Sequence, residues 1–327
     1  MKSIVLVAGL GTRMRPHTFT TPKPLLPVAG HPILKYILDM LAAIPQMEEF
    51  DIVVGHFGDQ IQAWVEAHYK IPARFFLQQN FDGQAPAVAL TRPTMRGDAI
   101  IIFGDGILQA DFSGLADFRA DALAFVKAVD DPSRLGVALV ENDFVTRLIE
   151  KPATPVSKLA LAGMYYVREM KKMYAAIDEQ IAKNIRTRGE FFLADTFNVM
   201  LARGARMQTR VIKSWLDAGT IESWLATNRA LLQRNGSREI STTNSKIIPP
   251  VFIADNVKIS RSTIGPFVSV SVNAVIENST VRDSIIAENA RVQNSTLDQS
   301  VVGAGARVEN FRGKLNVASA SVVDGTS

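Results

Sequence analysis

The stretch SIVLVAGLGTR, residues 3–13, decides the fold of the first half of the chain. Its apolar run, residues 3–8, has the length and composition of a strand that is buried on both faces. The glycine-rich turn Gly9-Leu10-Gly11 follows at once. A strand that leads directly into such a turn is typical of an open α/β sheet, in which ligands bind beyond the carboxyl ends of the strands.

The pattern continues along the chain. Further strand-like apolar runs occupy residues 51–55, 74–77 and 99–104, and residues 32–43 and 59–69 have the apolar spacing of amphipathic helices. This alternation predicts an α/β fold with an open, mostly parallel, Rossmann-like sheet. We expect it to form a catalytic domain over residues 1–233.

The pattern changes after a polar stretch, residues 234–246, which has the composition of a linker. Apolar residues then recur every sixteen positions, and alanines keep the same step at Ala274, Ala290 and Ala306. One apolar series is Val270, Ile286 and Val302. A β-sandwich with chance spacing would also be rich in short strands, but the regular step favours a solenoid. The sequence predicts a short left-handed parallel β-helix over residues 247–312 and a tail over residues 313–327.

Composition excludes several classes of chemistry. The 327 residues include no cysteine, which removes disulfides, thiolate metal sites and cysteine nucleophiles. A net charge of +4 gives no indication of nucleic-acid or membrane partners. No signal peptide and no apolar run long enough to cross a bilayer is apparent. We therefore expect a cytoplasmic protein that binds neither nucleic acid nor membranes.

The glycine-rich turn has the features of an anion site. The backbone at Ala8, Gly9, Gly11 and Thr12 can present successive N–H groups, and Arg13 adds a permanently charged, forked donor for phosphate oxygens. Met14 stands where a dinucleotide-binding turn needs its third glycine, and no Walker A lysine follows. A tight strand–helix turn without a ligand is the alternative interpretation.

Lys23 lies between Pro22 and Pro24. Because proline fixes φ and prevents continuation of a helix, this lysine is held at a defined place. A lysine that served only as solvated surface charge would not need such a scaffold.

At this point the sequence resembles a known family. AGLGTRMRP, residues 8–16, followed by TPKPLLPVAGHPIL, residues 21–34, is similar to the signature of the sugar-1-phosphate nucleotidyltransferases. The resemblance continues in order through FGDG, IEKP, GEFFLADT and WLDAGT, and the repeat region resembles the tail of long thymidylyl- and uridylyltransferase-like members. It covers essentially the whole chain.

The resemblance implies that a sugar-1-phosphate attacks the α-phosphate of a nucleoside triphosphate and expels pyrophosphate. It assigns Arg13 and Lys23 to clamping the phosphates, and Asp105 and Asp217 to binding Mg²⁺. The residues alone also favour Asp105 as a metal ligand, because it lies between two glycines directly after an apolar run. Each aspartate has an alternative role in capping a turn.

The resemblance also implies a sugar-phosphate site. Lys151 is expected to bind the phosphate and Glu150 the sugar hydroxyls, although Glu-Lys-Pro alone also describes a solvated surface pair. Small residues are expected to leave room for the ring, with a tyrosine at its far side. These residues are Gly136, Ala162, Gly163 and Tyr165.

The base is expected to be read by Gln78 and Gly83, whose spacing resembles the pyrimidine-reading segment of the thymidylyltransferases. A glutamine amide offers both a donor and an acceptor to a pyrimidine edge. The residues after Gly83, and Leu10 in the first turn, depart from common family patterns, which leaves the choice between dTTP and UTP open.

Three alternatives differ in function. A mannose-1-phosphate guanylyltransferase would use the same scaffold with other substrates. A regulatory homologue that binds nucleotide sugars without turnover would be expected to lack some of the four charged residues. An acyltransferase in the β-helix would generally use a histidine, yet the only histidines are His17, His31, His56 and His68. We expect the β-helix to assist homo-oligomerisation instead.

Overall fold

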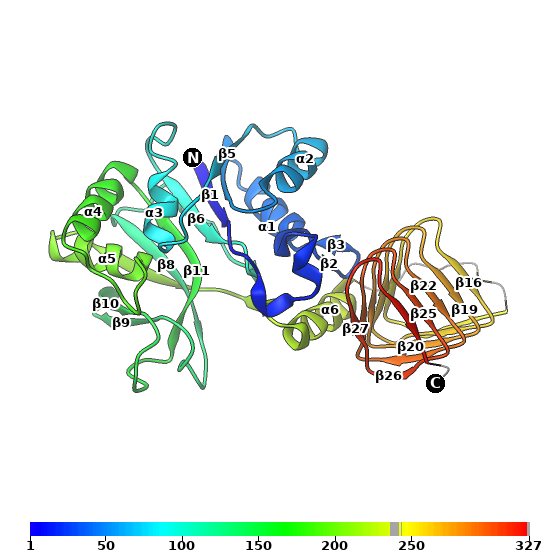
Figure 1. The fold of residues 1–327 in the computed structure, drawn as a ribbon. Helices are drawn as coiled ribbons and strands as arrows, with labels where there is room; N and C mark the ends of the chain where they lie inside the picture. Colours follow the sequence, from blue (N-terminus) through cyan, green and yellow to red (C-terminus); the bar gives the residue numbers. More distant parts are fainter. Residues whose placement is uncertain (236–241, 243, 326–327) are drawn as a thin grey trace. The chain divides into compact units, whose positions relative to one another are not determined.

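A computed structural model describes residues 1–235, 242 and 244–325 (Figure 1). The chain forms two compact units. The first unit comprises Met1–Gly9 and Ile37–Trp215, and the second unit comprises Leu10–Tyr36 and Leu216–Ser327. Most of the predicted linker, residues 236–241 and 243, lies outside the described residues. In the described part of the chain, no helix is long and apolar enough to span a membrane.

The first unit is built on a nine-stranded sheet. Its strands are β1 (Lys2–Val7), β4 (Glu49–Val54), β5 (Ala73–Leu77), β6 (Ala99–Phe103), β8 (Ala122–Ala128), β9 (Val137–Glu141), β10 (Phe144–Ile149), β11 (Leu159–Val167) and β12 (Met207–Val211). The remaining strand of this unit is β7 (Gly106–Gln109), and β13 (Ser214–Asp217) begins in it. Its helices are α2 (Gly58–His68), α3 (Gln84–Ala89), α4 (Met170–Ala182) and α5 (Leu193–Ala202), and α1 (Ile33–Ala42) ends in it.

The four strands predicted from sequence form the parallel part of this sheet, in the order β6-β1-β4-β5. Beyond β6 the sheet becomes mixed, because β11 runs antiparallel to β6, β8 and β9. Strands β9 and β10 form an antiparallel hairpin through Asn142 and Asp143, which both have positive φ. Asn and Asp tolerate this conformation, so the short turn fixes the antiparallel direction.

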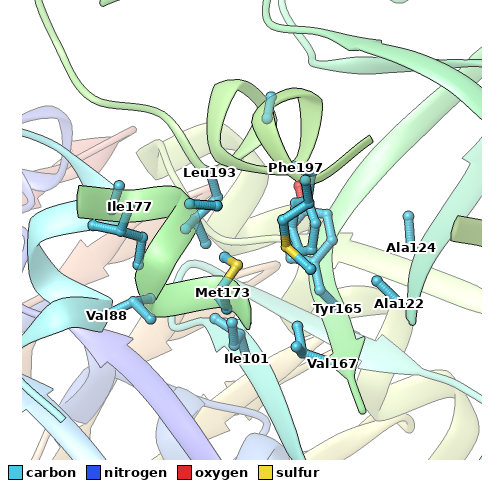
Figure 2. Close-up of a cluster of buried hydrophobic side chains, with 14 of the residues drawn as sticks. Val88, Ile101, Ala122, Ala124, Tyr165, Val167, Met173, Ile177, Leu193 and Phe197 are labelled. Atoms are coloured by element: carbon cyan, nitrogen blue, oxygen red, sulfur yellow. The ribbon is translucent and has the colours of Figure 1, made fainter. Parts of the chain in front are cut away.

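The core of the first unit lies where α3, α4 and α5 pack on β6, β8 and β11 (Figure 2). Ile101 and Val167 on the sheet face Met173 and Ile177 of α4 and Leu193 of α5. These side chains are fully buried, and burial of a large aliphatic side chain contributes about 1.5–3 kcal/mol. This apolar layer packs against β6, the strand that Asp105 follows.

The second unit combines three-residue 3₁₀ helices near its start with one long helix and a β-helix. The 3₁₀ helices are Thr12–Met14, His17–Phe19 and Lys23–Leu25, followed by β2 (Pro27–Val28) and β3 (His31–Pro32). The long helix is α6 (Ile221–Asn235). One β-helix sheet contains β14 (Lys246–Ile247), β17 (Thr263–Ile264), β20 (Thr280–Arg282), β23 (Thr296–Asp298) and β26 (Arg312–Gly313). The second contains β15 (Val251–Ile253), β18 (Val268–Val270), β21 (Ile285–Ile286), β24 (Val301–Val302) and β27 (Asn316–Val317). The third contains β16 (Lys258–Ser260), β19 (Val275–Glu277), β22 (Arg291–Gln293), β25 (Arg307–Glu309) and β28 (Val322–Asp324).

All three sheets are parallel, in agreement with the left-handed parallel β-helix predicted from the repeat. Ala274, Ala290 and Ala306 are fully buried, as their constant step indicated. The strands continue to Asp324, beyond residue 312, where we expected the repeat to end. The final coil is one residue shorter, since Val301 pairs with Asn316 and Arg307 with Val322. Because the last coil does not keep the sixteen-residue step, the repeat in the sequence does not reveal it.

The second unit also contains Leu10–Tyr36 and the region of α6, which we expected to belong to a domain spanning residues 1–233. Side-chain contacts explain this difference. Trp224 of α6 donates from Nε1 to the carbonyl oxygen of Pro27 at 2.8 Å. A Cβ on Gly30 would fall 2.3 Å from the ring of Phe252 in the β-helix. The segment Leu10–Tyr36 therefore packs with α6 and β15, which lie about two hundred residues later in the sequence.

Candidate active site

The glycine-rich turn is held in a conformation that requires glycine. Gly11 has φ +61°, and a Cβ there would lie 3.0 Å from Thr18 Cγ2 and 3.2 Å from Lys23 Cβ. Thr18 Oγ1 also donates to the carbonyl oxygen of Gly11 at 2.9 Å. Thr12 and Arg13 follow at the exposed surface of the second unit. The turn thus brings Arg13 to solvent on a backbone fixed by its neighbours.

The other two residues of the predicted anion site, Ala8 and Gly9, belong to the first unit. Ala8 is buried directly after β1, and Gly9 is exposed. A Cβ on Gly55 would fall 2.3 Å from the carbonyl oxygen of Ala8, so Gly55 allows the ends of β1 and β4 to approach closely. Ala8 is therefore fixed at the carboxyl edge of the sheet.

Lys23 is placed as its two prolines predicted. It begins the 3₁₀ helix Lys23–Leu25, and only 8% of it is exposed. The N–H of Leu26 donates to the carbonyl oxygen of Lys23 at 3.0 Å, which closes this short turn. A lysine that is so strongly buried loses little further rotamer freedom when it binds a phosphate.

Arg13 and Asp217 meet at one glycine in the second unit. Nη2 of Arg13 and Oδ1 of Asp217 each lie 3.0 Å from the point that a Cβ on Gly219 would occupy. Asp217 Oδ1 also accepts the N–H of Gly219 at 3.1 Å, so the turn-capping role is present as well. Thr227 Oγ1 donates to the main-chain oxygen of Asp217 at 2.6 Å and fixes its backbone. A predicted phosphate-binding cation and a predicted metal-binding carboxylate are therefore neighbours.

Asp105 occupies the expected strand end in the first unit. The preceding Gly104 donates its N–H to Leu6 at 2.9 Å, and a Cβ on Gly104 would fall 2.3 Å from Val7 Cγ1. Glycine therefore lets β6 pack closely against β1, and the exposed Asp105 comes directly after this contact. Its carboxylate is presented beyond the carboxyl edge of the parallel strands.

Gln78 and Gly83, the two residues predicted to read the base, are joined by a hydrogen bond. Gln78 is buried at the end of β5, and its Nε2 donates to the carbonyl oxygen of Gly83 at 3.1 Å. Gly83 has φ +122°, and a Cβ there would lie 2.6 Å from the backbone of Phe191. The loop between them is consequently fixed at both ends.

Glu150, Lys151 and Gly136 form a compact group in the first unit. A Cβ on Gly136 would fall 2.7 Å from Glu150 Oε2, so the glycine makes space for this carboxylate. Lys151 Nζ lies 3.6 Å from Glu150 Oε1 and over the ring of Phe192 at 5.4 Å. Burial raises the pKa of Glu150, and the charge of Lys151 opposes that shift.

Ala162, Gly163 and Tyr165 lie on β11 where its pairing with β8 is interrupted. The register shifts between Leu161 and Tyr165, and Gly163 has φ +71°. A Cβ on Gly163 would fall 2.7 Å from Phe103 Cδ2. Tyr165 is packed in the core against Phe197, with ring centroids 4.8 Å apart, and burial strongly raises its pKa. At the interrupted pairing of β11 with β8, Tyr165 thus stays buried in the core of the first unit.

Sequence reasoning did not single out two residues beside this group. Arg188 Nη2 donates to the carbonyl oxygen of Lys151 at 3.1 Å, and Lys151 itself has φ +46°. Burial raises the pKa of Asp195, whose Oδ2 has no hydrogen-bond partner, and its charge also acts on Glu150. Both residues lie in or beside the recognised stretch GEFFLADT, which was the available signal.

The donor set suits a hard divalent cation. Among the described residues, no three or more His, Asp or Glu side chains gather as a ready-made metal centre. Asp105 and Asp217 are both exposed carboxylates. Mg²⁺ is commonly held by one or two carboxylates together with phosphate oxygens of the substrate, so each of the two carboxylates by itself has the donor chemistry that suits this ion.

Comparison with known proteins agrees with the fold. The family described as nucleotidyl transferase matches residues 2–234, and the chain belongs to this family. Two glucose-1-phosphate thymidylyltransferases are similar over 88% of this chain and 87% of their own length. They come from Streptomyces griseus, at 30% identity, and Streptomyces antibioticus, at 31% identity. A crystal structure assigned as a glucose-1-phosphate thymidylyltransferase from Bacillus anthracis has a TM-score of 0.62 at 28% identity. It covers 73% of this chain and 98% of that one.

Proposed function

We propose that this chain makes a nucleoside diphosphate sugar and pyrophosphate from a nucleoside triphosphate and a hexose-1-phosphate. Glucose-1-phosphate with dTTP or UTP is the favoured substrate pair. The observation that carries the proposal is the approach of Arg13 and Asp217 to Gly219, within a chain whose family is the nucleotidyl transferases. The names of the Streptomyces relatives support the choice of sugar and base.

The reaction needs alignment more than proton transfer. A phosphate oxygen of the sugar-1-phosphate is already anionic and attacks the α-phosphorus, while the bond to the β-phosphate oxygen breaks and pyrophosphate leaves with that electron pair. Arg13 and Lys23 offset the negative charge that gathers on the phosphates. The buried position of Lys23 and the fixed turn at Gly11 hold these cations in place before substrate arrives.

Asp105 and Asp217 would hold Mg²⁺. When bound, the ion neutralises phosphate charge and orients the triphosphate. Ala8, Gly9, Gly11 and Thr12 contribute backbone N–H groups to the phosphates. These assignments rest on the resemblance and on the chemistry of the side chains.

The remaining residues select the substrates. Gln78 and Gly83 receive the pyrimidine, and their mutual hydrogen bond keeps the loop ready for it. Glu150 accepts hydrogen bonds from sugar hydroxyls, and Lys151 binds the sugar phosphate. Gly136, Ala162 and Gly163 leave room for the ring, while Tyr165 supports this region from the core.

One assay tests the whole proposal. Pyrophosphate release is measured for dTTP, UTP, GTP, ATP and CTP, each with glucose-1-phosphate, mannose-1-phosphate and N-acetylglucosamine-1-phosphate. A preference for dTTP or UTP with glucose-1-phosphate supports the proposal. A preference for GTP with mannose-1-phosphate identifies a guanylyltransferase, and binding without turnover for every pair identifies a regulatory protein.

The proposal extends to assembly and location. We propose that the protein forms a homo-oligomer with the assistance of the β-helix and has no nucleic-acid or membrane partner. Light scattering tests the oligomer, and cell fractionation tests a cytoplasmic location. The described β-helix contains no histidine, which disfavours an acyltransferase there.

A further inference from the structure

The segment Leu10–Tyr36 carries both phosphate-binding cations, Arg13 and Lys23, but little regular structure of its own. It contains only short 3₁₀ helices and two-residue strands before α1 begins. Ordering such a segment costs conformational entropy that its own hydrogen bonds do not repay. Its contacts within the second unit therefore decide how well the two cations are positioned.

The first set of contacts joins the turn to the last coils of the β-helix. His17 Nε2 donates to Asn316 Oδ1 at 2.6 Å, and only 3% of His17 is exposed. Burial lowers the pKa of His17, which favours the neutral ring. The ring also packs edge-on against Trp224 of α6, with centroids 5.3 Å apart. His17 is thus held by the β-helix and by α6 together.

The next residue transmits this constraint to the glycine-rich turn. Thr18 directly follows His17, and its hydroxyl donates to the carbonyl oxygen of Gly11 at 2.9 Å. Its methyl group also lies 3.0 Å from the Cβ position of Gly11. A continuous path of contacts therefore runs from Asn316 through His17 and Thr18 to Gly11, two residues before Arg13.

A second set of contacts holds the other end of the segment. Asn228 of α6 is fully buried, and its Oδ1 accepts the N–H of Ala29 at 2.8 Å. The same oxygen accepts the hydroxyl of Ser269, from β18, at 2.6 Å. Phe252 of β15 packs against Gly30 and lies 5.7 Å from the ring of His31. Early coils of the β-helix thus fix residues that follow Lys23.

We propose that the β-helix serves the reaction directly, with His17 and Asn316 as positioning residues that hold the turn carrying Arg13. This inference rests on the proposed function. The β-helix is then part of the scaffold for triphosphate binding, in addition to any role in assembly. Neither residue is expected to touch substrate.

The test compares Asn316→Ala with Lys314→Ala. Lys314 is exposed in the same coil of the β-helix and lacks a positive φ, so its replacement by alanine is the control. Loss of the part-buried hydrogen bond between His17 and Asn316 is expected to change triphosphate use by about fivefold to tenfold, as a higher KM or a lower kcat. The KM for the sugar phosphate should change less than about twofold, and the control should behave as wild type. His17→Gln, which retains a donor, should keep more activity than His17→Ala.

A second measurement does not depend on turnover. Hydrogen exchange on the full-length protein should show faster exchange in Leu10–Tyr36 for Asn316→Ala, with the sheet of the first unit unchanged. Three results would overturn the positioning role. The first is an equal loss of activity toward the triphosphate and the sugar phosphate, and the second is unchanged kinetics and hydrogen exchange. The third is an effect that appears only when the oligomeric state has changed. If wild type makes no nucleotide sugar, the proposed function fails, while the exchange result still decides whether Asn316 anchors the segment.

Discussion

The side chain of Gln78 donates to the main-chain oxygen of Gly83 across a five-residue loop, at 3.1 Å. This contact comes from the one part of the candidate site that is expected to distinguish bases. Since Gln78 is buried and Gly83 can only be glycine, both ends of the loop are fixed before a nucleotide binds.

Gln78→Ala is therefore expected to reduce the preference for pyrimidine over purine triphosphates by about tenfold, because it removes both a base contact and a loop restraint. The KM for the sugar phosphate should be spared. Competition assays with dTTP, UTP and GTP measure the effect. Gln79→Ala, at the exposed neighbouring position, is the control. An unchanged preference would remove Gln78 from base recognition.

The two predicted metal-binding carboxylates give a second prediction. Asp105→Asn and Asp217→Asn should each reduce kcat at least about a hundredfold, because each loses an electrostatic stabiliser of the phosphates. Asp117→Asn is the matched control, since the Asp117 side chain is 89% exposed and is not among the residues predicted to bind metal, nucleotide or sugar phosphate. Activity is measured with and without EDTA, then with Mg²⁺ restored. Turnover that persists in excess EDTA would contradict the metal assignment.

A third prediction concerns space at the sugar site. Gly136→Ala would place a Cβ 2.7 Å from Glu150 Oε2 and 2.9 Å from Leu161 Cδ1. Displacement of Glu150 should raise the KM for the sugar phosphate about tenfold and leave the KM for the triphosphate nearly unchanged. An equal effect on both substrates would show general misfolding instead, which a melting curve would reveal.

The fourth prediction concerns the pH dependence of stability. Burial raises the pKa of Asp51 to about 6 from a usual value of 3.8, a hydrogen bond from Thr94 opposes the shift, and the charge of Glu49 adds to it. Between these pH values the folded protein holds a proton that the unfolded chain has lost. This group's contribution to the free energy of unfolding therefore falls as pH rises toward 6 and is lost above it.

Asp51→Asn should flatten this dependence and give a melting temperature a few degrees above that of wild type at pH 7.5. The exposed Asp117→Asn should follow the wild-type curve. Melting temperatures from pH 5 to 8 are the measurement. Parallel curves for wild type and Asp51→Asn would show that Asp51 titrates normally.

The sequence predicted those parts of the structure that depend on local pattern. The parallel strands were found because each is a continuous apolar run, and the coils of the β-helix because Val270, Ile286 and Val302 keep one step. Asp105 was placed correctly after its strand, because two glycines and an apolar run mark that position. The antiparallel partners beyond β6 have no comparable signature.

The remaining features depend on contacts between distant residues. Nothing near His17 in the sequence indicates that Asn316, 299 positions later, accepts its hydrogen bond. The sequence around Asn228 similarly indicates only a polar residue of a helix. Asn228 is nevertheless fully buried, and its Oδ1 accepts hydrogen bonds from both Ala29 and Ser269. Such pairings arise only when the whole chain packs, so local spacing gives no information about them.

The interleaving of the two units has a consequence for biosynthesis. The chain enters the second unit at Leu10, leaves it after Tyr36 and returns to it at Leu216. During translation the segment with Arg13 and His17 emerges early, but Asn316 leaves the ribosome 299 residues after His17. We expect nascent chains and premature-stop products to lack an ordered phosphate-binding turn until the last coil is added. Full catalytic competence would then appear only at the end of synthesis.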